Sequence, residues 1–456
     1  MEELRKIIDY IKKQPILNKG VEILSQIYKK SDFYLVGGTI RDIILDKEPV
    51  DFDFIVNDSG IKGAKIFGEK IKGKLIILSE ADDEARVVAY KTIFDFKGLN
   101  KKTIIDDLSE RDFTINAIAF SFKEKKLIDP FNGIKDLKNK KIRLTNNLVL
   151  YQDPLRILRA MRFACELSFK IDKKIFEIGK KISLSNVAKE RISYEFFRIL
   201  ATDKSYPYIK KLYEIKLLAQ IFPLNYPFFE EKYLVNHSLK TYKKIEEIIA
   251  NQEFFGQFQK EWKEYFSISH SKEVLKLAGL FHDVAKPLTI KNSENGEVHF
   301  YGHETVGSKI MKKVLKDLKL SNDDIQHITK LIFYHMRLHL LSSAPVLTDR
   351  AIRRFFRDLG NYAFGLMILT YADGYATAGY TKHLEKAIKR MIKLKRKEEE
   401  EKKKIRLISG YDLIDLGLKP GPIFKKILQE IEDLYLEGKI KKKEDAIDYV
   451  KKNYLS

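Results

Sequence analysis

Hydrophobic and polar positions follow two different periods along this chain. Residues 31 to about 145 contain short β-rich runs, such as Phe33–Val36, Phe52–Val56 and Arg86–Phe96, with helical patterns between them. From about residue 146 the strand signals fade, and apolar residues recur at helical spacing, as in the segment Leu155–Cys165. The pattern predicts an α+β protein, in which a mixed α/β head is followed by an all-α remainder.

The two ends of the chain carry signals of their own. Apolar residues between Leu4 and Ile11 lie at helical spacing among charges and predict an amphipathic helix. The run from Lys393 to Arg406 is rich in both charges and suits a solvated helix or linker. Because 456 residues exceed what one core usually serves, we expect several segments. They are an N-terminal helix (1–30), a head (31–145), a neck (146–205), a helical body (206–392), and a charged linker with a helical tail (393–456).

The balance of charge indicates a kind of partner. Lys and Arg number 85 against 64 Asp and Glu, so the chain carries a formal net charge of +21. An excess of this size attracts polyanions, and nucleic acid is the first expectation. The alternative interpretation is a proteome biased toward Lys and Glu, which favours no particular partner.

Cysteine usage and hydropathy indicate the compartment. Cys165 is the only cysteine, which excludes an intrachain disulfide and a cluster of cysteine metal ligands. The N-terminal segment shows no targeting pattern, and no stretch is apolar for long enough to span a bilayer. We therefore expect a soluble, cytoplasmic protein that does not act at a membrane.

A glycine pair opens the first motif that carries chemistry. Gly37 and Gly38 follow a predicted strand and begin a predicted helix, so their backbone N–H groups can approach a phosphate. The next strand carries Asp51 and Asp53, and its two-residue period directs both carboxylates to one face. Asp95, opposite to its apolar neighbours on a later strand, is the candidate for a third carboxylate. This arrangement predicts a magnesium site for phosphoryl or nucleotidyl transfer; the alternative is a tight turn followed by surface aspartates.

Longer motifs carry a resemblance to a known family. The segments LVGGTIRDIILDKEPVDFDFIV (35–56), ERDFTINAIA (110–119), YQDPLRILRAMRF (151–163) and ERISYE (190–195) resemble the bacterial-type (class II) tRNA nucleotidyltransferase and poly(A) polymerase family. The resemblance is strong over about the first 200 residues and less distinctive beyond them. It implies a nucleotidyltransferase head, a nucleotide-selecting neck, a body and a tail.

The same resemblance implies roles for individual residues. The resemblance implies that magnesium is held by Asp51 and Asp53, that the triphosphate is bound by Gly37, Gly38 and Arg41, and that phosphate and ribose are contacted by Arg111, Asp112 and Asn116. Asp95 is a candidate from the strand pattern and not from the resemblance. An arginine offers a forked donor to phosphate. Asp112 and Asn116 have the (i, i+4) spacing of a helix, so together they can recognise a ribose 2′-hydroxyl. The alternative for Asp112 is helix capping.

Asp153 and Arg156 are predicted to select the base. They lie at (i, i+3) on a predicted helix, so their side chains can meet and present an acceptor beside donors. Cytosine and adenine both offer an exocyclic amine beside a ring-nitrogen acceptor, so the pair favours C and A, as the family's protein-templated selection implies. An ordinary surface ion pair is the alternative. The family commonly has an acidic residue where Gln152 stands, which leaves the orientation of Arg156 open.

A second set of candidate ligands lies downstream. Six residues occur in an order that resembles the HD phosphohydrolase superfamily: His237, His282, Asp283, His303, His335 and Asp373. Imidazole nitrogens and carboxylate oxygens suit a second divalent metal (Mg, Mn, Ni or similar), which would activate water against a phosphoester. Isolated histidines are more often core or surface residues, and that interpretation covers His270, His299, His327, His339 and His383.

Together these motifs predict a magnesium-dependent enzyme that adds all or part of the 3′-terminal CCA to tRNA from CTP and ATP. The alternatives are a poly(A) polymerase, an HD phosphohydrolase with an RNA-binding head, and a non-catalytic RNA-binding module. Full CCA, CC-only and A-only addition share the motifs, so the subtype stays open, as does the oligomeric state. Basic residues outside the head are expected to follow the tRNA acceptor arm through phosphate contacts: Lys210, Lys211, Lys393, Lys395 and Arg396.

Overall fold

The computed structural model describes residues 2–292, 298–405, 407–436 and 439–455. A seven-stranded sheet forms the head, in the order β3-β4-β5-β2-β1-β6-β7, and only β2 and β5 are parallel neighbours in it. Its strands are β1 (Phe33–Val36), β2 (Phe52–Val56), β3 (Lys74–Ser79), β4 (Glu84–Ala89), β5 (Thr92–Gly98), β6 (Ala119–Ser121) and β7 (Lys126–Ile128). The α+β class predicted from the pattern is confirmed.

Helices cover one face of this sheet. Alternate residues of β2 and β5 are buried on that face, and Phe67 of α4 packs on Phe94 and Phe96 with ring centroids 5.0 Å apart. Because strand side chains alternate, the polar residues of the same strands point to the other face. The helices of the head are α1 (Glu2–Lys13), α2 (Pro15–Ile27), α3 (Gly37–Ile44), α4 (Gly60–Ile71), α5 (Ile104–Glu110), η1 (Thr114–Asn116) and α6 (Gly133–Lys138).

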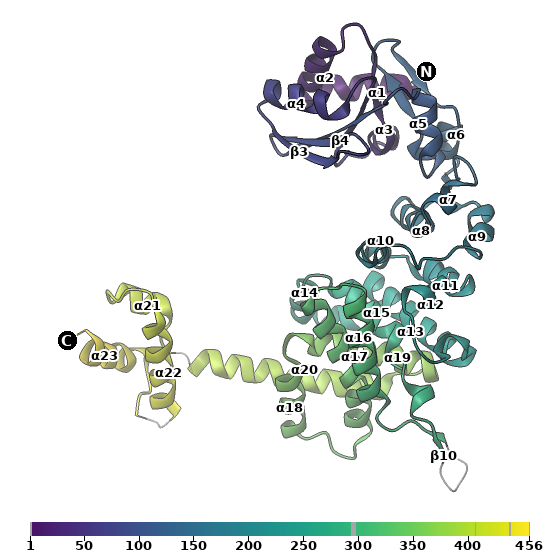
Figure 1. The fold of residues 1–456 in the computed structure, drawn as a ribbon. Coiled ribbons are helices and arrows are strands. Elements are labelled where there is room, and N and C mark those ends of the chain that lie inside the picture. Colours follow the sequence, from purple (N-terminus) through teal and green to yellow (C-terminus); the bar gives the residue numbers. More distant parts are fainter. Residues whose placement is uncertain (1, 293–297, 406, 437–438, 456) are drawn as a thin grey trace.

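Beyond the head the chain is almost wholly helical, as the spacing predicts. Short helices lead from the head to the body: α7 (Val149–Gln152), α8 (Arg156–Leu167), α9 (Lys173–Gly179), α10 (Lys189–Ala201), α11 (Tyr206–Glu214) and α12 (Leu217–Ile221). Figure 1 shows them bridging the two larger parts of the molecule. Two pairs of short strands interrupt the helices: β8 (Lys141–Ile142) with β9 (Lys170–Ile171), and β10 (Lys291–Asn292) with β11 (Val298–His299).

The body is built around one central helix. Every residue of α19 from Ala363 to Gly374 is buried, because neighbouring helices pack on all of its sides. The body helices are η2 (Phe228–Glu230), α13 (Lys232–Asn251), η3 (Glu253–Gln257), α14 (Gln259–Phe266), α15 (Ser271–Phe281), η4 (Lys286–Leu288), α16 (His303–Asp317), α17 (Asn322–Ser343), α18 (Asp349–Leu359), η5 (Gly360–Tyr362) and α19 (Ala363–Ala378).

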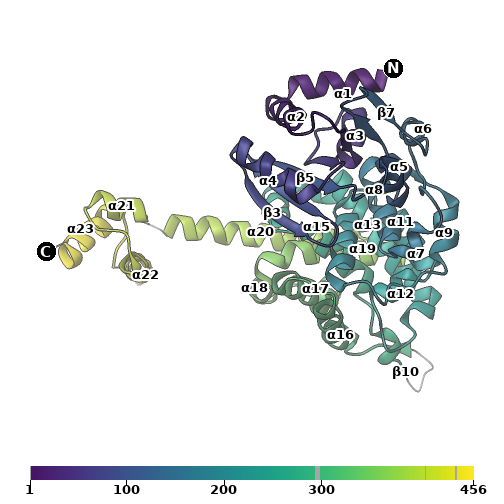
Figure 2. The same ribbon diagram turned by 45° about the horizontal axis from the view of Figure 1, so that its top comes forward.

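A long helix connects the body to the C-terminal helices. The charged run that begins at Lys393 forms the second half of α20 (Lys382–Ile405), and Arg406 lies outside the described residues. The helices α21 (Gly410–Asp415), α22 (Pro422–Leu436) and α23 (Lys443–Tyr454) share a separate small core, and Figures 1 and 2 both show them at the far end of α20. None of the helices described here is long and apolar enough to cross a membrane.

Candidate active site

Three carboxylates converge on the open face of the head sheet. Asp53 of β2 lies directly opposite Asp95 of β5, and one carboxylate oxygen from each of these two and from Asp51 lie within 4.8 Å of one another. The three carboxylates gather as the two-residue period predicts, although β2 begins at Phe52 and Asp51 lies one residue before it. Burial, and then the charge of Asp51, raise the pKa of Asp53 to about 7, while burial and Asp95 raise the pKa of Asp51. Three hard oxygen donors gathered at one point fit a divalent cation.

Arg86 holds the third carboxylate in place. This residue of β4 pairs with Asp95 across neighbouring strands, and its Nε and Nη2 donate to Oδ1 and Oδ2 at 2.7 and 2.8 Å. A bidentate pair of this kind fixes the plane of the carboxylate as well as its position. Sequence reasoning missed Arg86; its place on the polar side of an alternating strand was the available signal.

The glycine turn before α3 leaves room for the site. Gly37 has φ +67°, and a Cβ there would lie 2.5 Å from Nη1 of Arg111 and 3.2 Å from Oδ2 of Asp53. Glycine alone adopts this backbone conformation without strain and admits both neighbours. The turn therefore brings backbone and a guanidinium close to the carboxylates.

A continuous chain of polar contacts leads from this turn to the neck. Arg41 donates from Nη1 to Oδ1 of Asn116 at 2.8 Å, and Nδ2 of Asn116 donates to Oδ1 of Asp112 at 2.9 Å. Arg159 of α8 donates from Nε to Oδ2 of Asp112 at 2.9 Å. Burial alone would raise the pKa of Asp112, but the Arg159 charge and the hydrogen bond from Asn116 outweigh it and lower that pKa. Asp112 and Asn116 meet as expected, through the tight turn η1 rather than an α-helix.

The expectation that Asp153 and Arg156 share one helix is wrong. Helix α7 ends before Asp153, which is extended (φ −137°, ψ 97°), and α8 begins at Arg156. Pro154 explains the break, because the proline ring clashes with the preceding residue, here Asp153, when that residue is α-helical. Arg156 donates from Nη1 to the Val149 carbonyl at 3.3 Å. Asp153 accepts instead from Nη2 of Arg191 on α10 at 2.8 Å.

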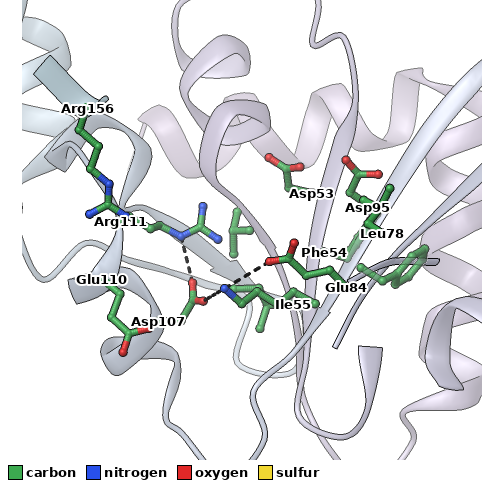
Figure 3. A pocket seen from close by; sticks show the side chains of 13 residues that line it. Asp53, Phe54, Ile55, Leu78, Glu84, Asp95, Asp107, Glu110, Arg111 and Arg156 are labelled. Atoms are coloured by element: carbon green, nitrogen blue, oxygen red, sulfur yellow. Dashed lines mark hydrogen bonds and ion pairs between the residues drawn. The ribbon is translucent and has the colours of Figure 1, made fainter. Parts of the chain in front are cut away.

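Two adjoining cavities meet at the carboxylates. A cavity of about 690 Å³ contains the glycine turn, the polar chain and the neck residues, with Asp153, Arg156 and Tyr194 on its walls. A smaller one of about 370 Å³, drawn in Figure 3, shares Asp53 with it, together with Arg111 and Arg156. Every residue that the resemblance implies for nucleotide binding lines the larger cavity except Gly37, which lies directly beside it.

Buried arginines of the neck complete the wall of the larger cavity. Arg162, 4% exposed, donates from Nε to Oε2 of Glu195 at 2.6 Å, and its guanidinium lies 4.1 Å from the Phe163 ring centroid. Glu195 also accepts from Nη1 of Arg159 at 3.5 Å. These contacts join α8 to α10 and hold Arg159 toward Asp112.

The body brings all six downstream candidates together. They form two groups whose ligand atoms each lie within 4.8 Å: His237, His282 and Asp373 in one, and Asp283, His303 and His335 in the other. Asp283 belongs to both, since its Oδ2 lies 3.3 Å from Nε2 of His282 and its Oδ1 lies 3.3 Å from Nε2 of His303. Its two oxygens are buried, and Oδ2 also lies 2.6 Å from Nζ of Lys286.

The tautomers of these histidines are set by the backbone. Nδ1 of His282, His303 and His335 lies 3.0, 2.6 and 2.7 Å from the carbonyl oxygens of Gly279, Phe300 and Ile332. A carbonyl only accepts, so each Nδ1 carries a hydrogen and each ring turns its Nε2 toward the centre. The Nε2 atoms of His303 and His335 lie 3.0 Å apart. Imidazole nitrogens that converge on buried carboxylates fit a bound divalent metal.

One histidine that the sequence analysis set aside belongs to this centre. Nε2 of His339 lies 2.8 Å from Oδ2 of Asp373, from one turn along the same helix, α17, that carries His335. His270 and His327 keep ordinary roles, against Asp324 and in a stack on Tyr362.

Several basic residues expected on the tRNA path are already in ion pairs. Nε and Nη2 of Arg396 donate to Glu261 of α14 at 2.8 and 2.5 Å, which ties α20 to the body. Lys395 lies 3.5 Å from Glu399, and Lys211 lies 2.8 Å from Glu214. Their charge is largely neutralised within the protein.

Three family models match this chain. A model described as the poly(A) polymerase head domain matches residues 33–143, and one described as a probable RNA- and SrmB-binding site of polymerase A matches residues 168–226. A third, described as a putative tRNA nucleotidyltransferase domain 2, matches residues 298–450. The matched segments follow the head, the connecting helices, and the body with the C-terminal helices.

Two named relatives are similar over nearly the whole length, and a third over part of it. A CC-adding tRNA nucleotidyltransferase of Synechocystis is 27% identical over 91% of this chain and 92% of its own. An A-adding tRNA nucleotidyltransferase of Deinococcus radiodurans is 26% identical over 92% and 94%. A CC-adding enzyme of Geobacter sulfurreducens is 37% identical over 39% and 43%.

Solved structures share the fold. The Thermotoga maritima CCA-adding enzyme, solved with tRNA, superimposes with a TM-score of 0.61 at 21% identity and covers 96% of this chain and 95% of its own. The arrangement of head, connecting helices, body and tail is therefore common to both chains.

Proposed function

The chain belongs to the bacterial-type tRNA nucleotidyltransferase and poly(A) polymerase family, and on that premise we propose that it transfers nucleotides from CTP or ATP to the 3′ end of tRNA. The observation that carries the proposal is the group of Asp51, Asp53 and Asp95 where a basic, nucleotide-sized cavity begins. The single cysteine supports a reducing, cytoplasmic setting.

The carboxylates would hold magnesium, and Asp95 would keep its orientation through Arg86. When bound, magnesium lowers the charge barrier between the incoming hydroxyl and the triphosphate. The backbone after Gly37, together with Arg41 and Arg111, would receive the phosphates. The tRNA 3′-oxygen forms a bond to the α-phosphorus, the bond from that phosphorus to pyrophosphate breaks, and the hydroxyl proton leaves to water. Positioning and electrostatics supply the catalysis.

Base selection would fall to Asp153 and Arg156. Asp153 presents an acceptor to the exocyclic amine of C or A, and Arg156 presents donors to the ring nitrogen. Arg191 holds Asp153 from the opposite wall, so the acceptor keeps one orientation although it is not on a helix. This arrangement favours a base that offers an exocyclic amine beside a ring-nitrogen acceptor, as C and A do, and it disfavours uracil and guanine.

We propose CC addition as the subtype. The relatives from Synechocystis and Geobacter are both CC-adding, and the latter has the higher identity, whereas the relative from Deinococcus adds A. The test uses purified protein with magnesium and tRNAs that end before CCA, after C and after CC, with CTP, ATP or both. Two C residues on the first substrate and no A on the third support the proposal. A single A on the third with no addition to the first would make the chain an A-adding enzyme. Addition of C to the first and of A to the third would make it a full CCA-adding enzyme, and long A tails a poly(A) polymerase.

The catalytic role of Asp51 is tested by a single substitution. Asp51→Ala should abolish incorporation while leaving tRNA binding within about twofold, because the carboxylate acts on the reacting atoms and not on the tRNA surface. Incorporation that survives in this variant would contradict the assignment.

A second activity is favoured by the position of Asp283 between two groups of ligands. We propose that the body binds divalent metal there and hydrolyses phosphate esters at RNA ends, as a phosphatase or a 2′,3′-cyclic phosphodiesterase. His282→Ala should remove that hydrolysis and leave nucleotide incorporation unchanged. Loss of both activities from this substitution would contradict separate centres.

A further inference from the structure

A separate cavity of about 910 Å³ lies in the body. It shares no lining residue with either cavity of the transfer site. Its walls are helix α16, the loop 223–226 before η2, and Leu288 at the end of η4. Figure 2 shows α12, α16 and β10 on the side of the body that lies away from the C-terminal helices.

The walls of this cavity are joined to the metal centre of the body. Helix α16 begins at the candidate ligand His303, and Leu288 follows the candidate ligand Asp283 by five positions. In the facing loop, Tyr226 donates from its hydroxyl to the carbonyl oxygen of Val284, the residue after Asp283, at 2.8 Å. The segments that position the metal ligands therefore also form the cavity.

One face of α16 carries a row of lysines. Steps of three and four residues place them on the same side of the helix, where they line the cavity: Lys309, Lys313, Lys316 and Lys319. None of the four has an ion-pair partner in the part of the chain that the structure describes, unlike Lys211, Lys395 and Arg396. Of the described residues that line the cavity, Asp317 alone is acidic. The wall therefore attracts an anion with more than one charge.

The floor of the cavity is apolar. It is formed by five side chains: Leu224, Tyr226, Leu288, Ile310 and Val314. Leu288 is 50% exposed, although it is a large aliphatic residue. Apolar groups beside unpaired lysines suit a ligand that has both a flat apolar part and phosphates, which is the chemistry of a nucleotide. A duplex keeps its bases stacked inside, so an unpaired nucleotide fits this floor better.

The length of the lysine row distinguishes a strand from a single nucleotide. Lys309 and Lys319 are ten residues apart, which is roughly 15 Å along a helix. Near the far end of the row, the Leu318 carbonyl accepts from the hydroxyl of Ser193 on α10, and Tyr194 of α10 lines the larger cavity of the transfer site. The row thus leads from the helix turn after His303 to the junction with the neck.

We propose that this cavity binds a single-stranded segment of RNA and holds its end for the metal centre of the body. The phosphates lie along Lys309, Lys313 and Lys316, and a base lies against Leu288. The inference rests on the second proposed activity, hydrolysis at RNA ends, and it names the RNA-binding surface of that centre.

The first test is the affinity of the full chain for a labelled, unstructured oligoribonucleotide, measured by fluorescence anisotropy. Lys309→Gln/Lys313→Gln/Lys316→Gln should raise Kd about tenfold. It should also reduce the slope of log affinity against log salt by about 2, because each phosphate contact to a single strand contributes about 0.7. The control Lys62→Gln/Lys65→Gln/Lys70→Gln removes the same charge from exposed positions of α4 in the head and should leave both values unchanged. Equal Kd in the two triple variants would overturn the inference.

A second test examines the apolar floor. Leu288→Ala should raise Kd for the oligoribonucleotide about threefold, because the base loses its apolar contact. Ile290→Ala is the matched control, since Ile290 is 54% exposed but does not line the cavity. An unchanged Kd in Leu288→Ala would show that no base lies on this floor and would contradict the site.

Free nucleotide is the other source of the same chemistry. Calorimetric titration with CTP and with ATP should give the same Kd for the wild type and the lysine variant. A rise in these constants as large as the rise for RNA would assign the cavity to a free nucleotide and overturn the strand.

Hydrolysis of RNA that ends in a 2′,3′-cyclic phosphate separates the inference from the activity on which it rests. The lysine variant should raise KM for this substrate about tenfold and leave KM for CTP in nucleotide incorporation unchanged. Wild-type protein that hydrolyses no RNA end would contradict the second activity, whereas the comparison of Kd values still decides whether the cavity binds RNA.

Discussion

Arg86 and Asp95 form a bidentate ion pair across neighbouring strands, with N–O distances of 2.7 and 2.8 Å. The pair aims one of three carboxylates at the point where two cavities meet. Its position indicates that the rate of nucleotidyl transfer depends on a residue that need not touch either substrate.

Arg86→Lys should lower kcat about 10- to 100-fold, because a lysine makes one contact where the guanidinium makes two and leaves the carboxylate free to rotate. KM for CTP should stay within about twofold, since Gly38 and Arg41, which are proposed to receive the triphosphate, line the larger cavity and Arg86 does not. Steady-state kinetics measure both constants. A variant in which KM rises while kcat is unchanged would place Arg86 in nucleotide binding instead.

Gly37→Ala should abolish most of the activity, because a Cβ at φ +67° costs about 1–2 kcal/mol of strain and meets Arg111 and Asp53. Gly68→Ala in α4 is the matched control, since its new Cβ would meet neighbours only at 3.6 Å, an ordinary contact. Incorporation assays and melting temperatures of both variants check this. Equal activity in the two would show that the turn tolerates a side chain.

The stability of metal-free protein should fall as pH rises from about 4 through 7. Burial and Asp51 raise the pKa of Asp53 to about 7, so the folded state holds a proton that the unfolded state has already released. Each unit of raised pKa is worth about 1.4 kcal/mol of stability, present at low pH and lost as Asp53 ionises. Thermal unfolding in EDTA should show this loss, Asp53→Asn should remove it, and magnesium should restore stability to the wild type at pH 8. A wild-type profile that matches the variant would contradict the raised pKa.

His339→Ala should weaken metal binding in the body about 10- to 100-fold, because the contact between Nε2 of His339 and Oδ2 of Asp373 orients that carboxylate. Metal titration by calorimetry measures the change, and RNA-end hydrolysis should fall in parallel. His383→Ala is the control, since His383 is exposed and stacks on Tyr380, away from the Asp373 carboxylate. An unchanged affinity in His339→Ala would reduce this histidine to a packing role.

The sequence alone determined which residues could gather at each centre. Asp51, Asp53 and Asp95 share a face because strand side chains alternate, and that period is readable without coordinates. The order of histidines and aspartates in the body likewise predicted a centre that the structure assembles completely. Local periodicity indicated the first centre, whereas the second was predicted from the resemblance of the residue order to the HD phosphohydrolase superfamily.

Local reasoning failed where one residue changed the backbone. The (i, i+3) spacing of Asp153 and Arg156 predicted a shared helical face, but Pro154 ends the helix between them and Asp153 turns to Arg191 instead. The residue before a proline was the signal that spacing alone overlooked.

Only the tertiary structure decided which partners hold the site together. Arg86, Arg191 and His339 reach their carboxylates from other strands and helices, 9, 38 and 34 positions away along the chain. No periodicity in a single element specifies such pairs, because strand register and helix packing place them.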